Sequence, residues 1–222
     1  MEKGKLIVLE GIDGSGKSAQ YKKICSRLEA DGIDYHHIVF PRYDKPSSAL
    51  LRMYLGGEFG ANPADVNAYA ASTFFAVDRF ASFRNDWGSI YNNGGFILSD
   101  RYTTSNAVHQ GGKVPDEELE EFFEWLYDLE YVKMELPKPD LVIYLDVDIE
   151  TSLSRMHLRQ EKTNTDADIH EKDIRYLENC LRVADKAADY YGWTRIPFKK
   201  DGIERSIDEK HEEIYKIIKD AL

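Results

Sequence analysis

A glycine-rich octapeptide near the amino terminus constrains the fold of this chain more than any other feature. Residues 11–18 read Gly-Ile-Asp-Gly-Ser-Gly-Lys-Ser and match the phosphate-binding loop pattern G-x-x-x-x-G-K-[ST]. The apolar run of residues 6–9 before the loop has the length and branching of a buried strand, and residues 17–28 after it can form a helix. A strand, such a loop and a helix in this order indicate a protein that binds nucleoside triphosphates.

The residue types of the loop follow from the chemistry of phosphate binding. Gly11, Gly14 and Gly16 let the backbone turn so that successive N–H groups converge on phosphate oxygens at the start of a helix. Lys17 would add positive charge at the β- and γ-phosphates, and Ser18 would offer its hydroxyl to Mg²⁺. We expect nucleotide binding by the whole loop, which consists of Gly11, Ile12, Asp13, Gly14, Ser15, Gly16, Lys17 and Ser18.

Length and charge narrow the class of protein further. The chain has 222 residues, and we expect a single α/β domain over residues 1–222. Its formal net charge of −11 argues against a general binder of nucleic acids or of acidic membranes. Cys25 and Cys180 have no disulfide or metal-type spacing, which predicts reduced thiols. The sequence has neither a bilayer-length apolar run nor a signal-type start, so we expect a cytoplasmic protein.

Strands alternate with helices along the rest of the chain. Further strands are expected in the runs 33–40, 96–100, 141–146 and 193–198. Helices are expected in residues 47–55, 62–87, 116–134, 150–160, 170–191 and 205–221. The glutamate-rich face of the helix 116–134 is interpreted as solvent exposed. The alternation predicts a three-layer α/β fold of the P-loop NTPase type, in which helices flank five parallel strands and ligands bind at the carboxyl ends of the strands.

The phosphate-binding loop by itself fits several classes of nucleotide-dependent protein. A GTPase would carry an Asn-Lys-x-Asp sequence, which this chain lacks, and a motor would need a much longer chain. A compact nucleotide kinase therefore remains, with two alternatives: a deoxynucleoside kinase, and a regulatory module that binds nucleotide without turnover. A nucleoside kinase would need a carboxylate base after the second strand, where this chain has Phe40-Pro41-Arg42-Tyr43.

Five motifs in order along the chain resemble the thymidylate kinase family. They are residues 10–18, Phe40-Pro41-Arg42-Tyr43, Phe75-Ala76-Val77-Asp78-Arg79, Asp100-Arg101-Tyr102 and Ser105-Asn106. The resemblance spans nearly the whole chain, up to its C-terminal helix. It implies that ATP and dTMP react to give ADP and dTDP with Mg²⁺ as the metal ion. It also implies a homodimer formed through apolar helices, which the apolar stretch 69–83 would fit.

The resemblance implies roles on the side of the phosphate acceptor as well. Phe75 would stack on the pyrimidine, Arg79 would donate to a base carbonyl, and Asn106 would read the polar edge of the base. The structural alternatives are core packing for Phe75, a surface charge for Arg79 and a helix cap for Asn106. The other acceptor residues implied are Asp13, Phe40, Arg42, Tyr43, Arg101, Ser105, His109, Asp168 and His170.

Several of these residues have more specific implied roles. Asp13 would face the 3′-hydroxyl of the acceptor sugar, Arg101 would clamp the donor and acceptor phosphates, and Asp100 would join Ser18 near the metal. His109 and His170 stand where many family members carry tyrosine, close to the sugar. We expect a preference for deoxyribose over ribose.

A polar segment of about residues 155–170 has the composition of a lid over the nucleotide. Family members that lack an arginine directly after the loop aspartate, as this chain does at Gly14, supply that charge from the lid. Arg155 and Arg159 lie four residues apart, on one face of the expected helix. We therefore expect Arg159, together with Arg155, to stabilise charge in the transition state. Arg159 and residues 199–202 are the candidates for the adenine pocket.

Overall fold

The central element of the structure is one parallel sheet. The computed structural model describes residues 3–163, 170 and 173–222, without the side chains of residues 157 and 159–163. The strands of the sheet are β1 (Lys5–Glu10), β2 (His36–Val39), β3 (Phe96–Asp100), β4 (Leu141–Leu145) and β5 (Thr194–Ile196). They follow the order β2-β3-β1-β4-β5, and every neighbouring pair is parallel. The predicted sheet is confirmed, although β2 and β5 are shorter than expected.

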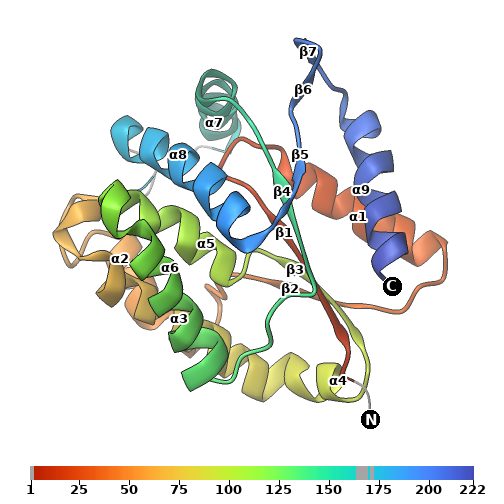
Figure 1. Cartoon of the computed structure of the whole chain (residues 1–222), viewed down its shortest axis with the longest axis horizontal. Helices are drawn as coiled ribbons and strands as arrows, with labels where there is room; N and C mark the ends of the chain where they lie inside the picture. The colour runs from red at the N-terminus through yellow and green to blue at the C-terminus, as the bar shows by residue number, and fades with distance from the viewer. Residues whose placement is uncertain (1–2, 164–169, 171–172) are drawn as a thin grey trace.

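Helices connect the strands and cover both faces of the sheet (Figure 1). The α-helices are α1 (Lys17–Ala30), α2 (Ala49–Leu55), α3 (Ala68–Ser82), α4 (Gly88–Asn92), α5 (Thr103–His109), α6 (Leu119–Tyr127), α7 (Ile149–Thr163), α8 (Ile174–Tyr191) and α9 (Ile207–Ala221). Short 3-10 turns occur at Pro46–Ser48, Pro63–Asp65, Gly111–Lys113 and Asp116–Glu118. Phe83–Trp87 and Asp128–Lys133 are π-helical, and β6 (Lys199–Lys200) pairs with β7 (Ile203–Glu204) in a separate hairpin.

The alternation of side chains along β1 explains the three layers. Ile7 and Leu9 belong to the core on the side of α1 and α9, whereas Leu6 and Val8 belong to the core formed with α5, α6 and α8. Figure 1 shows α1 and α9 on one side of the sheet and α3, α5, α6 and α8 on the other. Because both faces are covered, the ligand-binding edge is the one where the strands end.

Two of the long helices expected from the sequence are interrupted. The stretch 62–87 begins with the 3-10 turn Pro63–Asp65, and α3 starts only at Ala68, where the Asn67 side chain accepts a hydrogen bond from the backbone N–H of Ala70 at 2.8 Å. The stretch 116–134 divides into a 3-10 turn, α6 and a π-helical segment. The glutamate run is exposed, as expected, at Glu117, Glu118, Glu120, Glu121 and Glu124, whereas Glu130 of the π-helical segment after it is buried.

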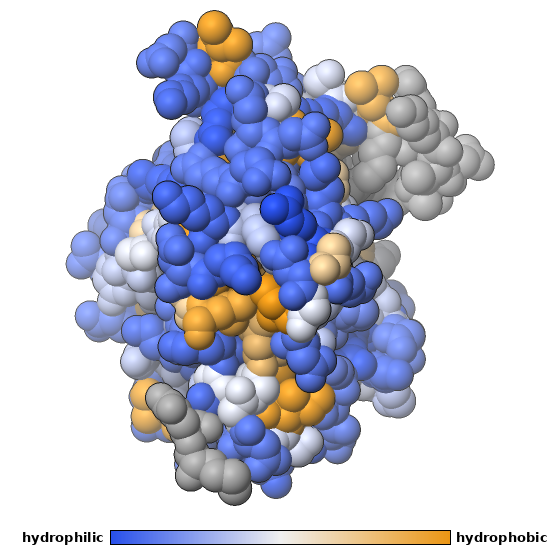
Figure 2. All heavy atoms as spheres, turned by 90° about the vertical axis from the view of Figure 1, so that its right-hand side faces the viewer, coloured by the Kyte–Doolittle hydropathy of each residue, from blue (hydrophilic) through white to orange (hydrophobic). Residues whose placement is uncertain are grey.

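The face of the molecule in Figure 2 agrees with the polar composition. The face that carries α1 and α9 is mostly hydrophilic, with apolar side chains gathered near its middle (Figure 2). Among the described residues, no helix is long and apolar enough to cross a membrane. Cys25 and Cys180 are free thiols, as their spacing predicts.

Candidate active site

The phosphate-binding loop lies between the end of β1 and the start of α1. Gly14 and Gly16 have φ angles of 79° and 90°, which side chains rarely adopt. A Cβ atom at Gly14 would lie 2.4 Å from the carbonyl oxygen of Ser152, so α7 approaches the loop too closely for any larger residue. Within the described chain, no side chain caps α1 at Gly16. The first N–H groups of a 14-residue helix therefore point to the place where a phosphate would bind.

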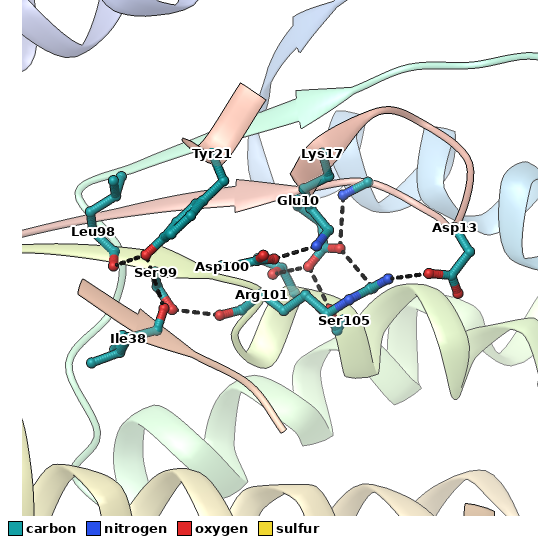
Figure 3. A network of polar contacts seen from close by, with 12 residues as sticks. Glu10, Asp13, Lys17, Tyr21, Ile38, Leu98, Ser99, Asp100, Arg101 and Ser105 are labelled. Atoms are coloured by element: carbon teal, nitrogen blue, oxygen red, sulfur yellow. Dashed lines mark hydrogen bonds and ion pairs between the residues drawn. The ribbon is translucent and has the colours of Figure 1, made fainter. Parts of the chain in front are cut away.

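Charged side chains from the ends of β1 and β3 converge beside this loop (Figure 3). Lys17 Nζ forms a short ion pair with the carboxylate of Asp100. Arg101 Nη2 lies 3.1 Å from Asp13 Oδ1, and its Nη1 lies 3.4 Å from Glu10 Oε1. Burial and the nearby charge of Arg101 lower the pKa of Lys17. Burial alone would also lower the pKa of Arg101, but Asp13 and Glu10 together raise it, so its guanidinium stays charged.

The backbone of Arg101 has an uncommon conformation, which determines where its side chain points. Its φ angle is 67°, in the left-handed region, where a residue other than glycine is strained by about 1–2 kcal/mol. Glu10 is fully buried, and its Oε2 accepts hydrogen bonds from Thr104 Oγ1 at 2.5 Å and Ser105 Oγ at 2.7 Å. These contacts fix the carboxylate that faces Arg101. The loop after β3 is thereby held so that Arg101 spans the phosphate-binding loop and α5.

A cavity of about 320 Å³ opens next to this charged group. Its wall includes loop residues after β1, β2 and β3, one face of α3, residues of α5, and His170. Most acceptor-side residues expected from the sequence line it, namely Asp13, Phe40, Tyr43, Phe75, Arg79, Arg101, Ser105, Asn106, His109 and His170, together with Lys17, Ser18 and Asp100 of the donor side. Residues from five separate segments thus meet around one space.

Arg42 lies differently from its neighbours in the sequence. Its Nη1 atom donates to Ser82 Oγ at 2.8 Å and to Asp86 Oδ2 at 2.5 Å, so the guanidinium is held against the end of α3 and the π-helical segment after it. Of the described residues, those lining the cavity include Pro41 and Tyr43 but not Arg42. Asp168 lies outside the described residues, as does the side chain of Arg159.

At the base of the cavity, Arg79 is buried together with a partner that the sequence did not reveal. Arg79 is 2% exposed, and its Nε and Nη2 atoms donate to the two carboxylate oxygens of Glu130 at 2.6 and 2.5 Å. The interpretation of Arg79 as a surface charge is therefore wrong. Asn106, also buried, donates through Nδ2 to the carbonyl oxygen of Ser72 at 3.0 Å. Phe75 is only partly buried and meets the ring of Tyr54 edge-on, at 6.3 Å between ring centres.

Two histidines form another part of the wall. The rings of His109 and His170 are stacked, with their centres 5.8 Å apart and their planes 12° from parallel. Arg101 Nη1 lies 3.0 Å from His109 Nε2, and a guanidinium can only donate, so His109 is neutral with its proton on Nδ1. Burial, with help from the charge of Arg101, lowers the pKa of His109 to about 4. Burial also lowers the pKa of His170 well below its ordinary value.

Tyr54 contacts His170 and in turn accepts a hydrogen bond from Lys113. Lys113 Nζ donates to Tyr54 Oη at 3.0 Å and to the carbonyl oxygens of Pro63 and Val66 at 3.1 and 2.8 Å. Tyr54 Oη lies 2.8 Å from His170 Nε2. Burial lowers the pKa of Lys113 to about 8. These contacts had no signal in the sequence, since neither Lys113 nor Tyr54 belongs to a motif.

A second cavity, of about 240 Å³, lies on the other side of the phosphate-binding loop. It is lined by Ser15, Gly16, Ala19, Gln20, Leu145, Asp146, Arg155, Ile196, Ile207 and Lys210. Arg155 donates to the carbonyl oxygen of Gly14 at 3.1 Å and to Glu204 Oε1 at 2.8 Å. Residues 199–202, a candidate part of the adenine pocket, form β6 and the turn of the hairpin that carries Glu204.

Comparison with known proteins identifies similar sequences and a similar fold. The family model for thymidylate kinase matches residues 9–214. A thymidylate kinase of Mycobacterium tuberculosis is 30% identical over 190 residues, which cover 84% of this chain and 87% of that protein. A probable thymidylate kinase of Thermococcus kodakarensis is 32% identical over 182 residues, covering 81% and 83%. The solved structure of a thymidylate kinase from Candida albicans has a similar fold, with a TM-score of 0.69 at 21% identity, and the match covers 98% of this chain and 92% of that one.

Proposed function

Because this chain belongs to the thymidylate kinase family, we propose that it transfers the γ-phosphoryl group of ATP to dTMP, giving ADP and dTDP. The observation that carries the proposal is the position of Arg101. Its guanidinium contacts Asp13 of the phosphate-binding loop and lines the cavity that Phe75 and Arg79 also line. One side chain would therefore reach both the donor phosphates, bound at the loop, and an acceptor in the cavity.

Phosphoryl transfer requires positive charge on oxygens that are already negative. In this reaction an oxygen of the dTMP phosphate attacks the γ-phosphorus of ATP, and the bond to the β-phosphate oxygen breaks. Lys17 and Arg101 would stabilise the charge on the transferring group, together with the N–H groups at the start of α1. Lys17 must leave Asp100 for this purpose, and the phosphates offer it a stronger negative partner.

The metal ion is part of the proposal. Ser18 is exposed at the cavity, and Asp100 also lines it, so a hydroxyl and a carboxylate oxygen face one space. These hard oxygen donors suit Mg²⁺, which usually keeps several waters and takes few protein ligands. When bound, Mg²⁺ would be held by Ser18 and Asp100 and would neutralise part of the negative charge of the ATP phosphates. The carboxylate of Asp100 would be available to the ion if Lys17 paired with the phosphates instead.

On the acceptor side, we propose that Phe75 stacks on the thymine ring while Arg79 and Asn106 contact its polar edge. Asp13 would face the 3′-hydroxyl of the sugar, and Phe40 and Tyr43 would line the sugar and phosphate region. His109 and His170 form the wall that would exclude a 2′-hydroxyl. Asp168 completes the proposed site from outside the described residues. Arg42 supports the loop after β2 through Asp86, and the phosphate contact proposed for it would require its side chain to turn.

We assign the stabilisation of charge in the transition state to Arg159, whose side chain lies outside the described residues. Arg155 is held between Gly14 and Glu204, so it positions the loop and the hairpin β6–β7 in this state. The proposal also includes a single cytoplasmic domain that forms a homodimer. Val77 and Phe80 of α3 are 45% and 40% exposed and would be covered by the second copy.

The test is release of ADP with Mg²⁺ and ATP in the presence of dTMP, dUMP, dCMP, dGMP, UMP or thymidine. We expect the highest kcat/KM for dTMP, with dUMP poorer by roughly 5- to 150-fold, since one methyl group contributes about 1–3 kcal/mol. A preference for thymidine would indicate a deoxynucleoside kinase instead. If no acceptor stimulates ADP release, the protein is a binding module. Equal use of dUMP and UMP would remove the proposed role of the two histidines.

A further inference from the structure

Glu130 is the buried carboxylate under the acceptor cavity, and we propose that it is a positioning residue for base selection. By fixing which atoms of Arg79 and Asn106 donate and which accept, it would select a pyrimidine with a 4-keto group over one with a 4-amino group. The inference rests on the proposed function, because it takes the base of the acceptor nucleotide to lie beside Phe75 in the cavity.

The carboxylate of Glu130 is saturated with hydrogen bonds. Its Oε2 accepts from Arg79 Nε at 2.6 Å and from Thr103 Oγ1 at 2.7 Å. Its Oε1 accepts from Arg79 Nη2 at 2.5 Å and from Asn106 Nδ2 at 3.4 Å. Glu130 is 0% exposed, and a carboxylate offers about four acceptor positions, so each of them is filled by a donor. A residue with a donor of its own could not replace it without leaving a hydrogen bond unmade.

These contacts determine which atoms of Arg79 and Asn106 remain to donate or accept hydrogen bonds in the cavity. The bidentate contact holds the planar guanidinium of Arg79 in one orientation, in which Nη1 points to the carbonyl oxygen of Tyr102 at 3.4 Å and keeps a further N–H. Asn106 uses Nδ2 for Ser72 and Glu130, and no described residue donates to its Oδ1. The cavity is therefore offered an N–H from Arg79 and an oxygen acceptor from Asn106.

That pattern matches one class of pyrimidine and opposes the other. Thymine and uracil present a carbonyl oxygen at position 4, which accepts, and an N–H at position 3, which donates. Cytosine presents an amino group at position 4, which donates, and a bare nitrogen at position 3, which accepts. Both contacts would be reversed with cytosine. Each reversed contact leaves a buried polar group without a partner, so dCMP should bind far more weakly than dTMP.

The experiment measures the ratio of kcat/KM for dTMP to kcat/KM for dCMP in wild-type protein and in Glu130→Gln. The amide places a donor against Arg79 or Asn106, which disturbs the polarity while keeping the shape. We expect this ratio to fall at least tenfold and KM for dTMP to rise, while the ratio of dTMP to dUMP stays unchanged because both have the same polar edge. Glu124→Gln makes the same change at an exposed position of α6 and should keep every wild-type value.

A merely structural role of Glu130 predicts a different result. Loss of folded protein lowers the apparent kcat for all substrates together and leaves both KM and the ratio of dTMP to dCMP unchanged. A Glu130→Gln protein with wild-type KM values and a wild-type ratio of dTMP to dCMP would overturn the inference. Glu130→Asp retains a carboxylate, so it should recover most of the ratio that Glu130→Gln loses. If wild-type protein uses no nucleotide as acceptor, the proposed function fails, and this inference fails with it.

A second variant covers the case in which Glu130→Gln does not fold. Thr103→Val removes one donor to Glu130 with little change of volume, and Thr103 does not line the cavity among the described residues. Loss of that hydrogen bond should let the carboxylate move and reduce the ratio of dTMP to dCMP about two- to fivefold. A wild-type ratio and a wild-type KM in this variant would also overturn the inference.

Discussion

Replacement of His109 by glutamine should make the protein markedly less sensitive to acid. In the native structure Arg101 donates to His109 Nε2, and the ring is held neutral, with its pKa lowered to about 4 by burial and by the charge of Arg101. In the unfolded chain the same imidazole has an ordinary pKa of 6.5. Between these two values the unfolded state binds the proton and the native state does not. Lowering the pH from 6.5 towards 4 therefore favours unfolding.

The size of the effect follows from the two pKa values. Integration of proton binding between pH 7.5 and pH 5 gives a loss of about 2 kcal/mol in the free energy of unfolding from His109 alone. For a domain of this size, that loss corresponds to a fall of about 4–8 °C in Tm. The lowered pKa of His170 adds a loss of the same sign. The glutamine side chain in His109→Gln would be neutral at every pH and could still accept from Arg101, so the contribution of the imidazole would vanish.

The assay is urea unfolding followed by circular dichroism at pH 7.5 and pH 5. The quantity compared is the change in unfolding free energy between the two pH values, which cancels any constant cost of the substitution. His109→Gln should reduce this change by about 2 kcal/mol relative to wild type. His37→Gln, on the exposed edge of β2, is the matched control and should leave it as in wild type. If His109→Gln loses as much stability in acid as wild type, the neutral state assigned to His109 is wrong.

Three further substitutions test the two sides of the site. Lys17→Met should reduce kcat about 10²- to 10³-fold in the ADP-release assay with circular dichroism unchanged, and near wild-type turnover would remove Lys17 from the mechanism. Phe75→Ala should raise KM for dTMP about 5- to 150-fold, because a stacked base contributes about 1–3 kcal/mol, and it should leave KM for ATP alone. Gly14→Ala should raise KM for ATP, because its Cβ would lie 2.4 Å from the carbonyl oxygen of Ser152; an unchanged KM would show that the loop and α7 can separate freely.

Features specified by local sequence could be predicted well. The phosphate-binding loop needs glycine at positions with positive φ, and the strand and helix beside it are strongly patterned, so the loop, β1 and α1 agree with expectation. Parallel strands buried on both faces appear as short apolar runs, which is why the sheet could be predicted. Most acceptor-side residues line one cavity because they follow strands that end at the same edge.

Features decided by tertiary contacts could not be predicted. Helix α5 begins with Thr103, Thr104, Ser105 and Asn106, which are weak helix formers, and it is stabilised by packing and by its hydrogen bonds to Glu10 and Glu130. Glu130 follows a run of acidic residues on a helix, and its partner Arg79 lies 51 positions away. The hairpin β6–β7 had one usable signal, the Asp201-Gly202 pair, whose φ angles of 54° and 79° suit a tight turn.

Hydrogen bonds between α7 and the phosphate-binding loop couple the positions of the two elements. Ser152 Oγ donates to the carbonyl oxygen of Asp13 at 2.6 Å, and Arg155 donates to that of Gly14 at 3.1 Å. The peptide planes of the loop cannot rotate without breaking hydrogen bonds to this helix. A nucleotide that reorients those planes would therefore move α7. A rotation of α7 would in turn change the contacts between the loop and the phosphates. A movement of either the helix or the loop is therefore transmitted to the other.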